Sequence, residues 1–263
     1  GWIEGNAFFQ TMRKLHRWLL NPPPQKGASS VGKMIVGIST LLMVVILISG
    51  LVIWWPRTHK ALNNRLKVSF RKGWRRFWYD SHVTLGFYST LFLLVMALTG
   101  LTWSFGWYRS FAYGLFGGNT SKQAQTHGTS LPQKENDART KKGGKKQTDY
   151  TAWDRAAQEV QTKYTGYTSL RIEEKKIQVI QRQQLRRTDT LKFNPKNGEI
   201  TETTTYAEVP RAQKLKGWFY AFHTGDWGGI YTKVLYFLAA FVGGVLPLSG
   251  YYLWLKKKQR VTR

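Results

Sequence analysis

Apolar positions in this chain gather into three long runs. The runs cover residues 34–55, 81–108 and 234–255, and none of them contains Asp, Glu, Lys or Arg. A helix needs about 20 apolar residues to cross a bilayer, and each run reaches that length. Trp and Tyr stand at the ends of the runs, as they do in the aromatic belts of membrane proteins. The pattern predicts three transmembrane helices rather than buried core helices of a large soluble protein.

Shorter patterns fill the segments before and after the second run. Residues 8–20 have the spacing of an amphipathic helix, and the proline-rich stretch 21–27 should end it. Residues 119–147 are rich in Lys, Gly, Ser, Thr and Gln, which predicts a flexible loop.

A small folded unit is expected after that loop. Residues 151–164 have helical spacing, while 168–172, 176–182 and 188–193 have the alternation or composition of strands. The NPKNG sequence at 194–198 is typical of a hairpin turn. These features predict one helix beside a small antiparallel sheet, and therefore a membrane α-helical protein with a small α+β domain.

Charge then fixes the expected topology. The chain has 40 Lys and Arg against 14 Asp and Glu, a net charge of +26. Eight of the basic residues lie in the loop 56–80 and five in the tail 256–263, so both should be cytoplasmic. Segments 1–33 and 109–233 should then lie outside. Because topology accounts for much of the charge, we expect a lipid bilayer as partner and no nucleic acid.

Two further features narrow the chemistry. The chain has no cysteine, which excludes disulfides, cysteine-bound zinc, iron–sulfur clusters and thiol catalysis. An N-terminus on the outer side needs something to carry it across the membrane, and no signal peptide is visible. We therefore expect an upstream part with one more span.

Histidines and glycines repeat in register with the three spans. Each of the three spans has one histidine on its N-terminal side, and these are His16, His82 and His223. A Ser-Gly or Thr-Gly pair stands near the C-terminal end of each span. The predicted topology places His16, His223 and Gly100 on the outer side. It places His82, Gly50 and Gly250 on the inner side.

This repeat favours haem binding over two simpler explanations. Glycines in membrane helices also serve helix packing, and a single interfacial histidine usually bonds a carbonyl or a headgroup. Three equivalent histidines beside glycine-lined gaps suit haem b, which takes one or two imidazole ligands and needs room for its ring. Gly86 lies one turn after His82 and should clear the same face. His16 and His223 can form one bis-histidine site, whereas His82 needs a partner that the expected upstream span would supply.

The same residues carry a resemblance to a known family. The motifs are RKLHRWL, WRRFWYDSHVTLGFY, ALTGLTWSFGW, and FHTGDWGG followed by the LPLSGYYLW span. With them the chain resembles the PepSY-associated transmembrane family over nearly its whole length, and the unit with the NPKNGEI hairpin resembles a PepSY domain. The first span and the first periplasmic domain of its characterised relatives have no counterpart among these residues, and we expect them in the upstream part.

The resemblance implies a location and a function. Characterised relatives include bacterial inner-membrane reductases of siderophore-bound iron, which hold two b-type haems between four spans. It implies that His16, His82 and His223 are haem ligands, that the main soluble domain is periplasmic, and that a ferric siderophore is the electron acceptor. No flavin or nicotinamide fingerprint is visible, so a quinol or a separate reductase should be the donor. A non-enzymatic PepSY sensor or accessory subunit is the alternative. A transporter is disfavoured by the small number of spans and the absence of acidic residues within them.

Overall fold

The structure, a computed structural model, describes five stretches of the chain. These are residues 6–25, 28–71, 73–118, 150–181 and 187–261. Within them lie three helices long and apolar enough to cross a membrane and one four-stranded antiparallel sheet. The expected fold class, a membrane α-helical protein with a small α+β domain, is confirmed. The loop predicted to be flexible, 119–147, lies outside the described residues.

The chain divides into two compact units, which are described separately below. The first consists of residues 1–112 and 222–263, and the second of residues 113–221. All three membrane-length helices belong to the first unit, and the sheet belongs to the second.

The three long helices extend past the apolar runs that predict them. They are α2 (Val31–Trp54), α4 (Trp74–Ser104) and α9 (Gly229–Val261). The helical backbone continues into charged residues at the membrane interface, so the absence of charge marks the hydrocarbon region and not the helix ends. The predicted second run also contains a break, since Phe105 is extended and a separate helix, α5 (Gly106–Leu115), follows it.

The first helix, α1 (Asn6–Trp18), is joined tightly to α2. It ends two residues before the predicted end because Leu19 and Leu20 adopt positive φ angles of 50° and 63°. Ser30 caps α2 by accepting the Lys33 amide hydrogen at 3.2 Å, and its hydroxyl donates to the Asn21 carbonyl at 2.7 Å. The turn between the two helices is therefore held from both sides.

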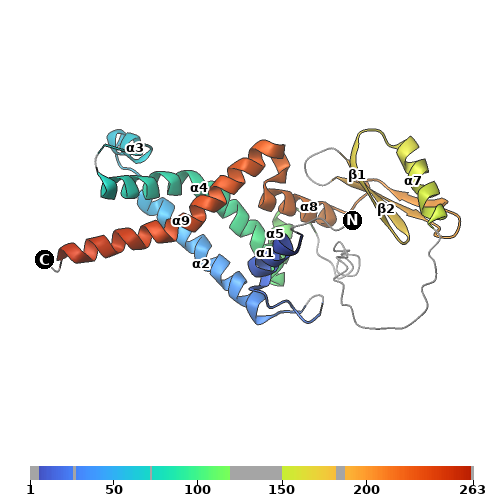
Figure 1. The fold of residues 1–263 in the computed structure, drawn as a ribbon, viewed down its shortest axis with the longest axis horizontal. Coiled ribbons are helices and arrows are strands. Elements are labelled where there is room, and N and C mark those ends of the chain that lie inside the picture. Colours follow the sequence, from blue (N-terminus) through green and yellow to red (C-terminus); the bar gives the residue numbers. More distant parts are fainter. Residues whose placement is uncertain (1–5, 26–27, 72, 119–149, 182–186, 262–263) are drawn as a thin grey trace. The chain divides into compact units, whose positions relative to one another are not determined.

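Within the first unit, α4 packs against both α2 and α9 (Figure 1). Trp54 of α2 stacks on Phe87 of α4 with ring centroids 3.7 Å apart. A Cβ atom built on Gly243 of α9 would lie 2.8 Å from Leu93 of α4, so this glycine lets the two helices approach closely.

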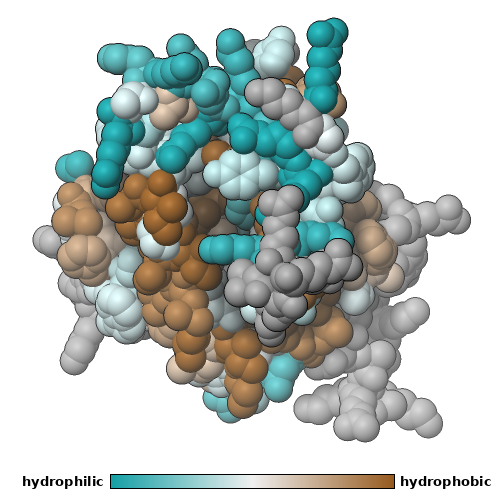
Figure 2. All heavy atoms as spheres, turned by 90° about the vertical axis from the view of Figure 1, so that its left-hand side faces the viewer, coloured by the Kyte–Doolittle hydropathy of each residue, from teal (hydrophilic) through white to brown (hydrophobic). Residues whose placement is uncertain are grey.

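Apolar side chains on the outside of this unit fit a lipid environment. Leu42, Val45 and Ile46 of α2 are each more than half exposed. Figure 2 views the end of the molecule at which α3 lies, and it shows apolar side chains gathered below a hydrophilic area. Such an apolar exterior is stable when lipid tails cover it, as expected for membrane helices.

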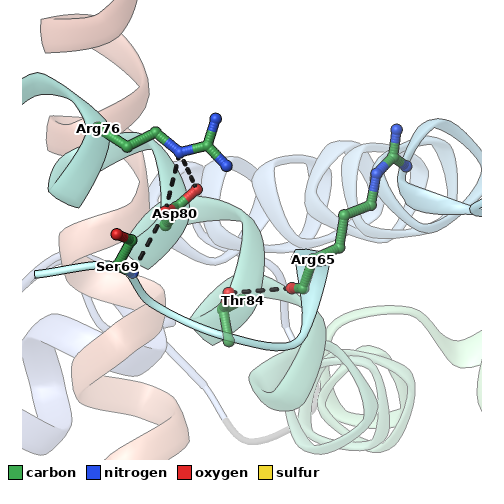
Figure 3. Close-up of polar contacts among 5 residues, drawn as sticks. All are labelled: Arg65, Ser69, Arg76, Asp80 and Thr84. Atoms are coloured by element: carbon green, nitrogen blue, oxygen red, sulfur yellow. Dashed lines mark hydrogen bonds and ion pairs between the residues drawn. The ribbon is translucent and has the colours of Figure 1, made fainter. Parts of the chain in front are cut away.

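The basic loop between α2 and α4 is ordered by a buried carboxylate. It contains a short helix that the sequence did not predict, α3 (His59–Arg65). Asp80 is only 4% exposed, accepts the Ser69 amide hydrogen at 3.2 Å and pairs with Arg76 at 2.8 Å (Figure 3). Thr84 donates to the Arg65 carbonyl at 3.0 Å, and the Arg65 guanidinium donates to the terminal Trp54 carbonyl of α2. These contacts tie the loop to the start of α4.

We expect Asp80→Asn to lower the free energy of unfolding by about 1–3 kcal/mol, because the change removes a buried charge-assisted bond. Thermal unfolding of the detergent-solubilised protein measures the loss. Asp226→Asn is the matched control, since its pair with Lys233 has side chains 35% and 52% exposed and should contribute less than about 1 kcal/mol. Equal effects of the two variants would contradict the role of burial.

The second unit contains one helix packed on a meander sheet. The helix is α7 (Thr151–Lys163), and the antiparallel strands lie in the order β1-β2-β3-β4. Their bounds are Tyr167–Glu173, Lys176–Gln181, Thr188–Phe193 and Ile200–Thr204. Alternate residues of β2 and β3 point to α7, and the core consists of Ala156, Val160, Ile177, Val179, Leu191 and Phe193. After the sheet, α8 (Arg211–Thr224) leads through the 3₁₀ turn Asp226–Gly228 to α9.

Candidate functional site

Two histidines that are far apart in the sequence lie together. His16 comes from α1 and His223 from the end of α8, and their ring centroids are 6.1 Å apart with 43° between the ring planes. Each ring extends from a helix end next to a spanning helix. The expected outer pair of histidines is thus side by side in the first unit.

The His223 ring is fixed against α4. Its Nδ1 atom lies 2.9 Å from the Met96 carbonyl oxygen and 3.2 Å from the Thr99 hydroxyl. A carbonyl oxygen only accepts, so Nδ1 carries the ring hydrogen and Nε2 keeps its lone pair. Trp103 packs edge-to-face on the ring at 5.2 Å. A Cβ atom on Gly100 would lie 3.2 Å from the ring carbon Cε1, so the ring rests on this glycine.

The His82 ring is fixed in the same way against α9. Its Nδ1 atom lies 2.8 Å from the Ser249 hydroxyl, and the backbone of Leu246 also hydrogen-bonds the ring. A Cβ atom on Gly250 would lie 3.3 Å from Cε1 of His82. Both histidines therefore bond the protein through Nδ1.

The two sites lie on one face of α4, near its opposite ends. His82 and Gly100 are 18 residues apart. That separation equals five helical turns, or about 27 Å, close to the roughly 30 Å of a bilayer core. Residues five full turns apart point in the same direction, which explains why both sites face the helices around α9.

The structure divides the four glycines expected near a haem into two groups. Gly100 and Gly250 lie directly against histidine rings. A Cβ atom on Gly86 would lie 3.5 Å from Cδ2 of Leu246, an ordinary contact distance. At Gly50, no atom of the described residues outside the adjacent turns of α2 lies within 4 Å of a Cβ position. The sequence interpretation missed the bonds made by Thr99 and Ser249, although the Ser/Thr-Gly spacing was the signal that could have revealed them.

The spacing of the outer pair suits one metal between two imidazoles. Bonds of about 2 Å to each ring nitrogen, plus the ring radii, place two axial imidazole centroids about 6 Å apart. A metal held by side chains alone needs three or four ligands. Among the residues that the structure describes, no group of three or more His, Cys, Asp or Glu could hold one. Two imidazoles fit a haem, because the porphyrin supplies the remaining ligands.

Comparison with known families decides what kind of protein carries this arrangement. The family described as the PepSY-associated TM region matches residues 1–257. The chain belongs to this family. No curated protein matches the chain. The resemblance expected from the histidine and glycine motifs is therefore confirmed, and this PepSY-associated TM protein crosses a lipid bilayer several times.

Acidification should destabilise the haem-free PepSY-associated TM protein through His223. Burial lowers the pKa of His223; the hydrogen bond to Met96 opposes this effect and the nearby His16 adds to it. At pH values between the lowered pKa and about 6.5, His223 binds more protons in the unfolded chain than in the folded chain. The free energy of unfolding therefore falls as the pH decreases below about 6.5. Thermal unfolding between pH 7 and pH 5 should show a shallower slope for His223→Gln. Identical slopes for the two proteins would contradict this expectation.

Proposed function

We propose that this protein moves electrons across a bacterial inner membrane through haem b and reduces an acceptor on the periplasmic side. The paired rings of His16 and His223, 6.1 Å apart, are the observation that supports it most directly. His82, near the other end of α4, is the ligand proposed for a second haem. Two such sites near opposite ends of the bilayer-spanning helix α4 would carry electrons from one membrane face to the other.

The histidines at these sites can serve as neutral imidazole ligands of haem iron. A haem b at each end would supply a one-electron Fe(III)/Fe(II) couple. His16 and His223 would hold the outer haem through their imidazole nitrogens. Trp103, which packs on the His223 ring, would lie beside the haem where an acceptor could take up electrons. Burial of His223 keeps its ring neutral, as a ligand must be.

We propose a ferric siderophore as acceptor and a quinol or separate reductase as donor. Reduction to Fe(II) weakens binding by hard oxygen ligands, so electron transfer would release the metal for uptake. Basic residues of the segment expected outside, such as Arg109, Lys214 and Lys216, also favour approach of anionic ferric complexes. The non-enzymatic alternative, a PepSY sensor or accessory subunit, uses the same membrane fold without an iron cofactor.

A reduced-minus-oxidised optical spectrum of the purified protein tests the proposal first. We expect the bands of a six-coordinate b-type haem, and pyridine haemochrome quantification gives the number of haems per chain. Stopped-flow mixing of the dithionite-reduced protein with a ferric siderophore should then reoxidise the haem. A protein that stays colourless after haem reconstitution would overturn the proposal and favour the binding module.

A further inference from the structure

One three-residue pattern holds both histidine rings. In α4 the residues are Met96, Thr99 and Gly100, and in α9 they are Leu246, Ser249 and Gly250. Each set has a backbone group at its first position, a hydroxyl three residues later and a glycine four residues later. We call such a set a histidine cradle. Its three members lie on one helix face, because residues three and four apart are neighbours on a helix.

The hydroxyl in each cradle is oriented by its own helix. Ser249 donates its single hydrogen to the Leu246 carbonyl at 2.9 Å. Thr99 donates to the Val95 carbonyl at 2.6 Å and lies 3.1 Å from the Met96 carbonyl. With its hydrogen so used, the hydroxyl oxygen accepts from the histidine Nδ1–H group. Backbone and hydroxyl therefore favour the same tautomer.

The glycine completes the cradle by letting the ring reach these acceptors. Positions for a Cβ atom lie 3.2 Å from His223 at Gly100 and 3.3 Å from His82 at Gly250. A methyl group there would push the ring away from the helix. Such a shift would lengthen the hydrogen bonds from Nδ1, which are 2.9 Å to the Met96 carbonyl for His223 and 2.8 Å to the Ser249 hydroxyl for His82.

We propose that the two cradles are positioning elements that lock His223 and His82 in the Nδ1–H tautomer, with Nε2 aimed away from the cradle helix as the iron-binding atom. The inference rests on the proposed haem function for its purpose, but the tautomer itself is a property of the haem-free chain. Thr99 and Ser249 act through the histidines and are positioning residues. A bound Nδ1–H also raises the basicity of Nε2 toward a metal.

A third copy of the pattern supplies an internal control. In α2 the matching residues are Ile46, Ser49 and Gly50, and Ser49 donates to the Ile46 carbonyl at 3.0 Å as Ser249 does to Leu246. Among the residues that the structure describes, and apart from the adjacent turns of α2 itself, no atom lies within 4 Å of a Cβ position at Gly50. Ser49→Ala thus removes the same hydroxyl and the same intrahelical bond as Ser249→Ala, at a cradle that no histidine in the described part of the chain enters.

The decisive experiment is ¹⁵N NMR of the haem-free, full-length protein labelled at histidine. We expect the resonances of His82 and His223 to report a protonated Nδ1 and an unprotonated Nε2. Thr99→Val should lower the Nδ1–H population of His223 alone, and Ser249→Ala should lower that of His82 alone, because each variant removes one acceptor and keeps the backbone one. Thr99→Ser and Ser249→Thr should restore it, while Ser49→Ala should change neither ring. Unchanged tautomers in Thr99→Val and Ser249→Ala, or equal loss in Ser49→Ala, would overturn the proposal.

Haem affinity gives a second readout if a haem-free variant does not fold. Loss of a partner behind a metal-bound histidine lowers metal affinity by about 10–100-fold. Transfer of haem to apomyoglobin should show this loss for Thr99→Val and Ser249→Ala, with a higher midpoint potential because the ligand is less basic. Gly250→Ala should lower affinity similarly, whereas Gly244→Ala on the same helix, which has open space around it, should not.

The two proposals fail in different ways. A protein that binds no haem but shows the expected tautomers would overturn the electron-transfer function and leave the cradles intact. A haem protein whose affinity, potential and tautomers are unaffected by the cradle variants would overturn the positioning role alone.

Discussion

We expect His223→Ala and His82→Ala each to remove one b-type haem from the purified protein. Changes behind a metal-bound histidine already cost about 10–100-fold in affinity, so loss of the ligand itself should cost at least as much. The effects should be separate, because the two rings lie near opposite ends of α4 and contact different helices. Pyridine haemochrome analysis of each variant measures the remaining haem.

His16→Ala should act differently from His223→Ala. The His16 ring is exposed, whereas the His223 ring is anchored to α4, so the variant should retain the haem on His223 with one axial position open. The optical and EPR spectra of the outer haem should change from low spin to high spin. His59→Ala is the control, since His59 starts the surface helix α3. A protein in which His59→Ala loses haem and His16→Ala does not would contradict the assigned ligands.

Gly32→Ala should disturb the outer site without changing a ligand. Gly32 is buried at the start of α2, and a Cβ atom there would overlap the carbonyl oxygen of Trp18 in α1. The end of α1 must then move, and this helix carries His16 two residues earlier. We expect a loss of about 1–3 kcal/mol in unfolding free energy, typical of overpacking, and a high-spin fraction in the spectrum of the outer haem.

The inner site provides the internal comparison for Gly32→Ala. His82 is held by α4 and α9, which do not include the turn at Gly32, so the spectrum of the inner haem should stay low spin or keep its wild-type form. Gly244→Ala adds the same methyl group in open space and should leave both sites unaltered. A wild-type spectrum for Gly32→Ala would show that the contact between Gly32 and Trp18 does not set the position of His16.

Much of the fold was predictable because membrane helices and small sheets follow simple periodicities. The uncharged runs located α2, α4 and α9, and the strand patterns at 168–172, 176–182 and 188–193 located β1, β2 and β3. The helix ends were less predictable, since a helix can continue through charged residues at the interface, as α4 does from Trp74. The short helices α3, α5 and α8 lack a long apolar run and were missed.

The site was predicted as a set of residues but not as a set of contacts. Repeated histidines and Ser/Thr-Gly pairs led us to expect His82 and Gly250 on one side of the membrane and His223 and Gly100 on the other, and in the structure each of these rings lies against that glycine. Sequence spacing along one helix does not say which helix will pack against it. The role of backbone groups at Met96 and Leu246 was also invisible, because every residue type has the same carbonyl.

Because the helix between His82 and Gly100 is uninterrupted, the number of residues between them sets how the two sites are oriented relative to each other. One residue inserted or deleted between them would rotate one site relative to the other by about 100° about the axis of α4. The rotated end would then face lipid or α2 instead of the helices around α9. Related chains should therefore tolerate many apolar exchanges in this segment but preserve its number of residues, and an insertion scan through it should separate the two sites more completely than most point substitutions.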